Sequence, residues 1–409
     1  MAKFSSERFP PGFFDLPRDA GDVLPLDVIE RWTTSAQTQE VARAILAPHT
    51  LRGVVVSSDA AGLTRLTRER PLVEILMMVN RPKELVHAWG AAIGGRALGV
   101  WAADNTQMFY GDAVAADRVV GMLLAMLDQV SAECEVAIGL CAHHGQFFEL
   151  AGGVYGPDAD RVELVAEEHT EGGELVITDA LAAQLEEGRY TLATRADLAR
   201  EFGTILRVSG GPRLGDVTPE DFRYPAPFSV DFYEDLSRTK GRRRSMLPKP
   251  RYQEVAVVLI EREAEDRDVP EVAALNDLAL TAAMMRIGGA LLRDLGGTEI
   301  KNAGLVGIYT FAQARPAVGF AEEFRRALRA QGIQCRIGVD VGQVLTFDLG
   351  GGKRDIAGSP VNIASKLAQD VGEFGSIYVS EAAATQAGTA SEHRISVDVS
   401  GVPLAATVL

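Results

Sequence analysis

The chain has 409 residues, of which 47% are hydrophobic and 24% charged, with a formal net charge of −15 and a sequence pI of about 5.0. This length and apolar content suffice for two domains of ordinary size, and the acidic balance argues against nonspecific binding of nucleic acid. Three cysteines are too few for a disulfide framework. No run approaches the roughly 20 apolar residues of a membrane helix, and the N-terminal residues lack the apolar core of a signal peptide. We therefore expect a soluble, cytoplasmic protein without membrane insertion.

The chain begins with a segment, residues 1–50, that is irregular at first and then has helical patterns around residues 26–29 and 41–45. We expect it to dock on another part of the protein or to dimerise. The first domain, residues 51–208, begins with a buried strand, a glycine turn and a long helix. Two short strands, an apolar helix, two further strands, a short helix and another strand follow. This order is typical of a ferredoxin-like core with extra strands.

The same order of elements then repeats. Two matched pairs of glycine turns, at residues 94 and 296 and at residues 173 and 375, give the same offset, because 296 minus 94 and 375 minus 173 both equal 202. A constant offset indicates a duplicated domain. We therefore predict an α+β fold with two tandem ferredoxin-like domains (βαββαβ with extra strands), the second at residues 251–409.

The predicted linker, residues 209–250, is rich in glycine, proline and charge. Its basic cluster at residues 240–244 is either a solvated stretch or a regulatory or anion-binding one.

The most informative part of the second copy begins at Arg336. Apolar residues alternate through residues 337–341 as in a half-buried strand, and a second strand is expected after Gly342, ending in a hairpin of glycines at residues 350–352. The period then changes to that of a helix, with Ser359 as the expected cap and Pro360 at the first helical position.

Polar residues converge where this helix begins. Asn362 and Lys366 are four residues apart and so share one helix face, while Asp355 lies at the mouth of the preceding strand. Polar side chains gathered at a strand end and a helix start predict a small-molecule site.

The first strand of the first copy ends in a carboxylate. Asp59 is followed by Gly62, Leu63 and Thr64, a glycine turn that enters a helix. Such a turn exposes backbone N–H groups and the positive end of a helix, which suit a phosphate. A carboxylate beside it can hold a divalent cation that bridges phosphates, although an Asp at such a junction is also a common helix cap. A second carboxylate, Asp104, is expected in the neighbouring hairpin, and its presence favours metal binding over helix capping.

These motifs resemble those of the class III nucleotidyl cyclases, whose signature places Asn-x-Ala-x-Arg on a helix after a strand–hairpin–strand and a glycine. The corresponding residues here are Asn362, Ala364 and Lys366, so that lysine stands in place of the family arginine. The resemblance implies that Asp59 and Asp104 bind two divalent cations, Mg²⁺ or Mn²⁺, with the turn at Gly62, Leu63 and Thr64 beside the phosphates.

For the second copy, the resemblance implies the groups that bind the nucleoside. Lys301 and Asp355 correspond to the residues that contact the adenine edge, Asn362 to the one that orients the ribose, and Lys366 to the one that stabilises the charge developing during transfer. In the first copy the matching positions carry Val100, Asp160 and Leu164, with no clear match for Asp355.

The second copy lacks the metal carboxylates in turn. Glu261 stands near the position of Asp59 without a glycine turn after it, and Leu305 occupies the position of Asp104. The two copies are therefore complementary. The resemblance implies an intramolecular pseudo-heterodimer that converts ATP to cyclic AMP and pyrophosphate at one composite site between the domains.

The cationic positions of the site keep a second hypothesis open. Lys366 retains the charge of arginine but not its planar fork, Gln146 stands where the family often has arginine, and Ser400 replaces the lysine of a Lys-Gly pair. The alternative is a catalytically weak or inactive pseudocyclase that binds nucleotide, with ATP favoured, and acts as a regulatory or scaffold protein. A regulatory protein partner would then use the N-terminal segment or the linker.

Overall fold

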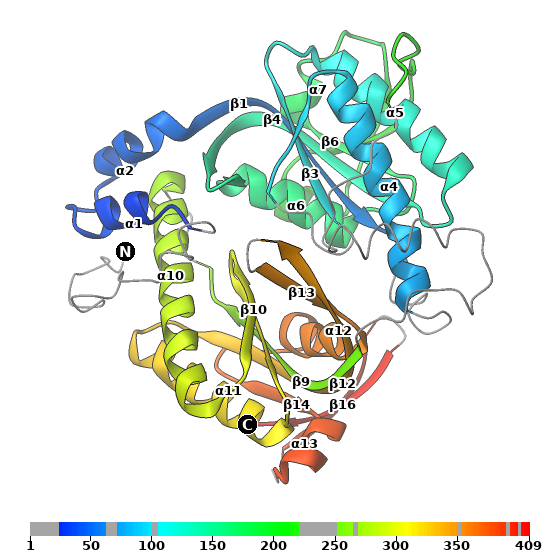
Figure 1. Ribbon diagram of the computed structural model, residues 1–409. Helices are drawn as coiled ribbons and strands as arrows, with labels where there is room; N and C mark the ends of the chain where they lie inside the picture. Colours follow the sequence, from blue (N-terminus) through cyan, green and yellow to red (C-terminus); the bar gives the residue numbers. More distant parts are fainter. Residues whose placement is uncertain are drawn as a thin grey trace. The chain divides into compact units, whose positions relative to one another are not determined.

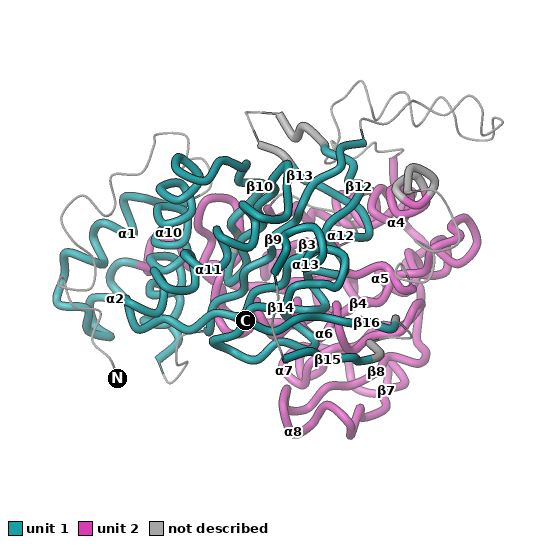
Figure 2. The backbone as a smooth tube through the Cα atoms, turned by 90° about the horizontal axis from the view of Figure 1, so that it is seen from below, with its two compact units in different colours: residues 1–45, 249–409 teal, residues 46–248 magenta. Residues whose placement is uncertain are grey.

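The computed structural model describes residues 24–62, 72–99, 105–220, 252–264, 269–350, 353–389, 393–399 and 402–409. The chain divides into two compact units (Figure 2), unit 1 with Met1–Ile45 and Lys249–Leu409 and unit 2 with Leu46–Pro248. The first sequence copy therefore lies in unit 2, and the second copy lies in unit 1 together with the N-terminal helices.

Unit 2 is built on a sheet whose strands follow the order β2-β3-β1-β4-β6-β8-β7, with β5 paired to β4. The strands are β1 (Thr50–Ala60), β2 (Arg96–Ala97), β3 (Thr106–Gly111), β4 (Ile138–Leu150), β5 (Gly153–Tyr155), β6 (Leu175–Thr178), β7 (Thr191–Thr194) and β8 (Ile205–Gly210). The helical segments are η2 (Ala47–His49), α4 (Leu72–Ala92), α5 (Ala116–Glu133), α6 (Pro157–His169), α7 (Asp179–Ala182) and α8 (Ala199–Phe202).

The helices of unit 2 cover both faces of its sheet (Figure 1). Val55 on β1 and Phe109 on β3 pack with Val162 of α6 in one core cluster. Because successive residues of a strand point to opposite faces, Met108 and Tyr110 face the other way, and their side chains reach Gly90 of α4. The middle of β1, which leads to Asp59, is thus held between two packed layers.

Unit 1 has the same topology, with the strand order β10-β11-β9-β12-β14-β16-β15 and β13 paired to β12. Its strands are β9 (Tyr252–Arg262), β10 (Thr298–Ala303), β11 (Val306–Phe311), β12 (Cys335–Gly350), β13 (Lys353–Ala357), β14 (Ile377–Ser380), β15 (Arg394–Val399) and β16 (Val402–Val408). Its helical segments are α1 (Leu26–Thr33), α2 (Gln39–Leu46), α10 (Pro270–Leu295), α11 (Ala314–Ala330), α12 (Ser359–Ser365), η4 (Lys366–Asp370) and α13 (Glu381–Ala387). The predicted α+β fold with two similar domains is confirmed.

The N-terminal helices of the chain pack on α10. Trp32 of α1 is fully buried and donates a hydrogen bond from its indole nitrogen to the side-chain oxygen of Asn276, at 2.9 Å. Arg43 of α2 forms an ion pair with Glu271 at 2.9 Å. The two helical patterns expected near residues 26–29 and 41–45 are therefore helices, and in this structure they dock on the second copy.

Two predicted boundaries are wrong in the stretch that follows Arg336. The strand does not break at Gly342: β12 runs unbroken to Gly350, because β9 pairs with it from Cys335 to Leu345 and Gly342 keeps its place in that register. Ser359 is not the helix cap either. Gly358 occupies the cap position, and α12 begins at Ser359.

Among the helices of the described part of the chain, none combines the length and the apolar character needed to cross a bilayer.

Candidate functional site

The residues predicted to contact the nucleoside base come together in unit 1. Lys301 lies on the edge strand β10 and Asp355 on β13, 54 residues later in the sequence. The Lys301 Nζ atom lies 3.4 Å from both carboxylate oxygens of Asp355. The carboxylate is buried, with 6% of its side chain exposed, whereas the lysine side chain is 37% exposed. The backbone N–H of Ile356 also donates to Asp355 Oδ1 at 2.9 Å, so the carboxylate is oriented while the ammonium group remains accessible.

The residues predicted to contact ribose and phosphate lie on the next helix. Asn362 belongs to α12, and Lys366 opens the π-helical turn η4 directly after it. The Lys366 N–H still bonds to the carbonyl oxygen of Asn362, so the i,i+4 relation and the shared helix face are retained. The Lys366 ammonium lies 3.4 Å from Asp370 Oδ2, and only 14% of its side chain is exposed. A π-helical turn inside a helix is often found at functional sites.

A glycine in β12 sets the height of this helix above the sheet. At Gly338 an added Cβ atom would overlap the carbonyl oxygen of Ala364 on α12. The absence of a side chain therefore allows α12 to lie directly on β12. We call Lys301, Asp355, Asn362 and Lys366 the base half-site.

Of the two predicted metal residues of unit 2, Asp59 lies near the end of the central strand β1. Asp59, partly exposed, is the second-last residue of β1. The hydroxyl of the preceding residue, Ser58, bonds to that of Thr106 at 2.6 Å, which places the start of β3, two residues beyond Asp104, beside Asp59. Asp104 itself lies outside the described residues. Gly62 has φ +78°, in the left-handed region that favours glycine and makes the expected turn. Leu63 and Thr64 also lie outside the described residues.

The donor types of this second group suit a hard divalent cation. Carboxylate oxygens are the ligands that Mg²⁺ and Mn²⁺ prefer, and such sites are often completed by water and substrate phosphates. Within the described ranges, no cluster of three or more His, Cys, Asp or Glu residues could hold a metal ion by itself. We call Asp59 and Asp104, with the turn at Gly62, Leu63 and Thr64, the metal half-site.

In unit 1 the equivalent of Asp59 is neutralised within the protein. Glu261 on β9 lies opposite Arg336 on β12, in the same register in which Asp59 lies opposite Gly139. Arg336 donates to Glu261 Oε2 from Nε at 3.0 Å and from Nη2 at 2.9 Å. A guanidinium group thus occupies the surroundings of this carboxylate, as expected for a structural role.

In unit 2, acidic residues lie at or beside the helix positions that correspond to Asn362 and Lys366. Glu163 of α6 accepts a hydrogen bond from Gln107 at 3.2 Å, and burial, with the nearby charges of Glu167 and Asp160, raises its pKa to about 7. These acids would repel a phosphate. Asp160 and Leu164 hold the helix positions of Asn362 and Lys366, and Val100 lies outside the described residues.

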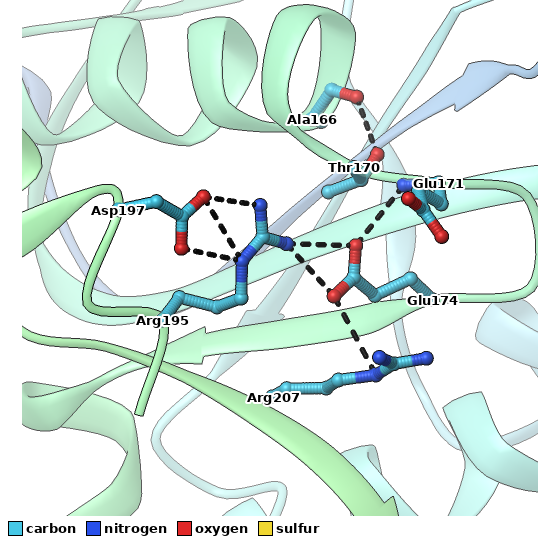
Figure 3. A network of polar contacts seen from close by, with 7 residues as sticks. All are labelled: Ala166, Thr170, Glu171, Glu174, Arg195, Asp197 and Arg207. Carbon is cyan, nitrogen blue, oxygen red and sulfur yellow. Dashed lines mark hydrogen bonds and ion pairs between the residues drawn. The ribbon is translucent and has the colours of Figure 1, made fainter. Parts of the chain in front are cut away.

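Another part of unit 2 contains a polar network that the sequence analysis did not predict (Figure 3). Arg195 donates to the buried carboxylate of Glu174 at 2.8 Å and to Asp197 at 2.8 Å, and Arg207 approaches Glu174 at 3.5 Å. The hydrogen bond to Asp197 and the pairing with Glu174 raise the pKa of Arg195. Glu174 also accepts the backbone N–H of Glu171 at 3.0 Å. Glu174 thus accepts from several donors, and the network joins the start of β6 to the end of β7 and to β8.

The adjacent histidines of β4 have separate partners. His143 bonds through Nδ1 to Thr178 at 2.8 Å, and His144 bonds to Asp112 at 2.9 Å. They lie in the middle of the continuous strand β4.

Comparison with solved structures identifies the fold. The chain is similar to a class III adenylyl cyclase-like ATP-binding protein from Pseudomonas aeruginosa, with a TM-score of 0.51 and 11% identity over 82% of this chain and 85% of that protein. It also matches the adenylyl cyclase CyaB from P. aeruginosa, at 18% identity over 40% of this chain and 96% of that one with a TM-score of 0.32. A guanylyl cyclase domain from the aquatic fungus Blastocladiella emersonii matches at 18% identity over 39% of this chain and 94% of the domain, with a TM-score of 0.32.

No protein-family model matches the chain, and no curated protein matches its sequence. The first of the structural matches spans most of both chains, and it shows the fold. The resemblance to class III nucleotidyl cyclases, predicted from the motifs around Asp59 and Asn362, is confirmed at the level of the fold.

Proposed function

We propose that the protein binds ATP and converts it to cyclic AMP and pyrophosphate, using the base half-site of unit 1 and the metal half-site of unit 2 on one nucleotide. The observation that supports this most strongly is the approach of Lys301 to Asp355. A donor and an acceptor lie side by side, which is the combination needed to pair with the amino group and ring nitrogen of adenine. Asn362 and Lys366 follow on the adjacent helix.

Each half-site supplies a different part of the chemistry. Bound at Asp59 and Asp104, two divalent cations, Mg²⁺ or Mn²⁺, would supply positive charge at the phosphates and at the attacking 3′-oxygen. Asn362 would orient the ribose through its amide, and Lys366 would neutralise charge that develops on the phosphate. Orienting the 3′-hydroxyl towards the α-phosphate is itself a large contribution to the rate of such an intramolecular transfer.

The test is product formation by the purified full-length protein. ATP is incubated with Mg²⁺ or Mn²⁺, and cyclic AMP is measured by mass spectrometry, with GTP and pyrimidine triphosphates in parallel. Asp59→Ala should abolish the product. Asp128→Ala, which removes an exposed carboxylate of α5 that pairs with Arg213, should leave it unchanged. Cyclic AMP no higher in the wild type than in Asp59→Ala would rule out the cyclase.

One observation favours a pseudocyclase as the second candidate. The Lys366 ammonium, which would have to reach a phosphate, is mostly buried and lies beside the carboxylate of Asp370. A lysine held in this way is less available to substrate than an arginine with several donors. Micromolar ATP binding by equilibrium dialysis, without cyclic AMP and with GTP bound more weakly, would identify a nucleotide-binding regulatory or scaffold protein. An Asp370→Asn variant that gains turnover would show that this pairing restrains Lys366.

A further inference from the structure

A fully buried arginine lies at the end of the central strand of unit 1. Arg262, the last residue of β9, has 0% exposure. Its Nη1 donates to Asp277 Oδ1 at 2.8 Å and to the Glu263 carbonyl at 3.1 Å. Its Nη2 donates to the Asp277 carbonyl at 3.0 Å and to the Gly304 carbonyl at 3.4 Å. Burying a guanidinium group is costly unless it is paired in this way.

One of these partners is the tip of a hairpin. Gly304 joins β10 to β11 with φ +55°, and its carbonyl also accepts the hydroxyl of Thr281 at 2.8 Å. The backbone N–H of Arg262 donates to the Leu305 carbonyl at 3.0 Å. Arg262 therefore connects the hairpin tip both to β9 and to α10, which carries Asp277 and Thr281.

The same hairpin carries the base-contacting lysine. Lys301 lies three residues before Gly304 on β10, which is the terminal strand in the sheet order and pairs with β11 alone. A register shift between Glu299 and Lys301 interrupts even this pairing. The position of Lys301 relative to Asp355 therefore depends on how firmly the hairpin tip is held.

The residue that corresponds to Arg262 in unit 2 is small and apolar. Ala60 ends β1 as Arg262 ends β9, and it is buried with 5% exposure. A small apolar residue thus completes the strand in the copy that has no base half-site. The buried arginine occurs in the copy that has one.

We propose that Arg262 is a positioning residue of the base half-site: by fixing the β10–β11 hairpin tip to α10, it holds Lys301 at the distance from Asp355 at which both can contact a nucleotide base. The expected effect of Arg262 on base selectivity rests on the proposed function. Arg262 touches neither Asp355 nor Lys301, and it acts through the backbone of Gly304 and Leu305.

The experiment compares Arg262→Met with a matched control. Arg325→Met removes a different arginine of unit 1, which is only partly buried and donates to the Gly375 and Leu409 carbonyls at 3.2 Å and 2.6 Å. Two quantities are measured in the full-length protein: the rate at which an amine-reactive reagent modifies Lys301, by mass spectrometry, and the ratio of ATP to GTP affinity, by displacement of a fluorescent nucleotide in the presence of Mn²⁺.

Arg262→Met should increase modification of Lys301 several-fold and reduce the ATP-to-GTP affinity ratio by about tenfold, the effect of losing one charge-assisted hydrogen bond. Arg262→Lys, which keeps one donor group, should recover part of both changes, and Arg325→Met should change neither. If Arg262→Met fails to fold, Asp277→Asn weakens the same pairing more gently and should shift both readouts in the same direction.

The two readouts separate the inference from the proposed function. Unchanged Lys301 modification in Arg262→Met and Asp277→Asn would overturn the positioning role. Increased modification in a protein whose wild type binds no nucleotide would uphold the structural link but overturn the proposed function, and with it any role of Arg262 in selectivity.

Discussion

A buried carboxylate under the base half-site makes the stability of the protein depend on pH. Asp340 lies on β12, two residues after Gly338, and only 4% of it is exposed. Burial raises its pKa to about 6, although a hydrogen bond from the Ser380 hydroxyl opposes the shift. Asp340→Asn replaces this acid with a neutral group of the same shape that still accepts from Ser380.

The sign follows from the proton affinity of the two states. The folded protein holds the Asp340 proton more tightly than the unfolded chain, whose Asp pKa is about 3.9. Protonated Asp340 therefore contributes stability that is fully present below about pH 4 and is lost as the pH rises through about 6. A shift of about two pKa units corresponds to roughly 3 kcal/mol. Burying the asparagine amide hydrogens has a desolvation cost of its own, which reduces the expected gain at neutral pH to about 1–2 kcal/mol.

The assay is urea denaturation of the wild type and Asp340→Asn between pH 4 and pH 8, with the exposed Asp294→Asn on α10 as control. The stability difference between Asp340→Asn and the wild type should grow from pH 4 to pH 6 in favour of asparagine and then stay constant. The Asp294→Asn difference should not follow this curve. A difference that is flat across this range, or that favours the wild type more as the pH rises, would refute the reasoning.

Three further substitutions test other parts of unit 1. Lys301→Met should weaken ATP binding tenfold or more through the loss of a charge-assisted hydrogen bond, and displacement titration measures this. It should also lower stability by about 1–3 kcal/mol, because it leaves the buried carboxylate of Asp355 without its cation; urea midpoints measure this loss. Gly338→Ala should destabilise the protein by about 1–3 kcal/mol, because the added methyl group pushes α12 away from the sheet. ATP binding, measured at a temperature at which the variant is still folded, should be lost as well if α12 is displaced. Trp32→Phe should lower stability by about 1–3 kcal/mol, since it removes the buried hydrogen bond from the Trp32 indole to Asn276; a urea midpoint equal to that of the wild type would contradict this.

Much of the fold could be predicted because local sequence patterns determine it and because these patterns occur twice. Alternation of apolar residues and the repeated glycine turns indicated the strands and the duplication. The errors arose where tertiary pairing overrides a local signal. Gly342 predicts a break, but β12 continues through it because β9 supplies partners on both sides of the glycine. Gly358 rather than Ser359 caps α12, because a glycine with φ +153° lets the chain turn sharply from β13 into the helix.

The candidate site could be predicted only in part, for a different reason. The proximity of Lys301 and Asp355 joins two strands 54 residues apart, and only the family resemblance indicated it. The role of Arg262 was not predicted, because a basic residue after an apolar strand is usually exposed to solvent at the end of that strand. Its burial depends on Asp277, which approaches from the next helix, and no spacing rule connects the two.

The two copies differ most instructively in what lies opposite the carboxylate near the end of the central strand. In unit 2 Asp59 lies opposite Gly139, which adds no side chain and no charge. In unit 1 Glu261 lies opposite Arg336, and the guanidinium group satisfies it at 2.9 Å. A cation approaching Glu261 would have to displace a guanidinium group that is already paired with it, which carries a cost. The same strand end therefore carries a glycine opposite its carboxylate in one copy and a paired arginine in the other, and this difference is the structural basis for our proposal that only unit 2 binds the metal.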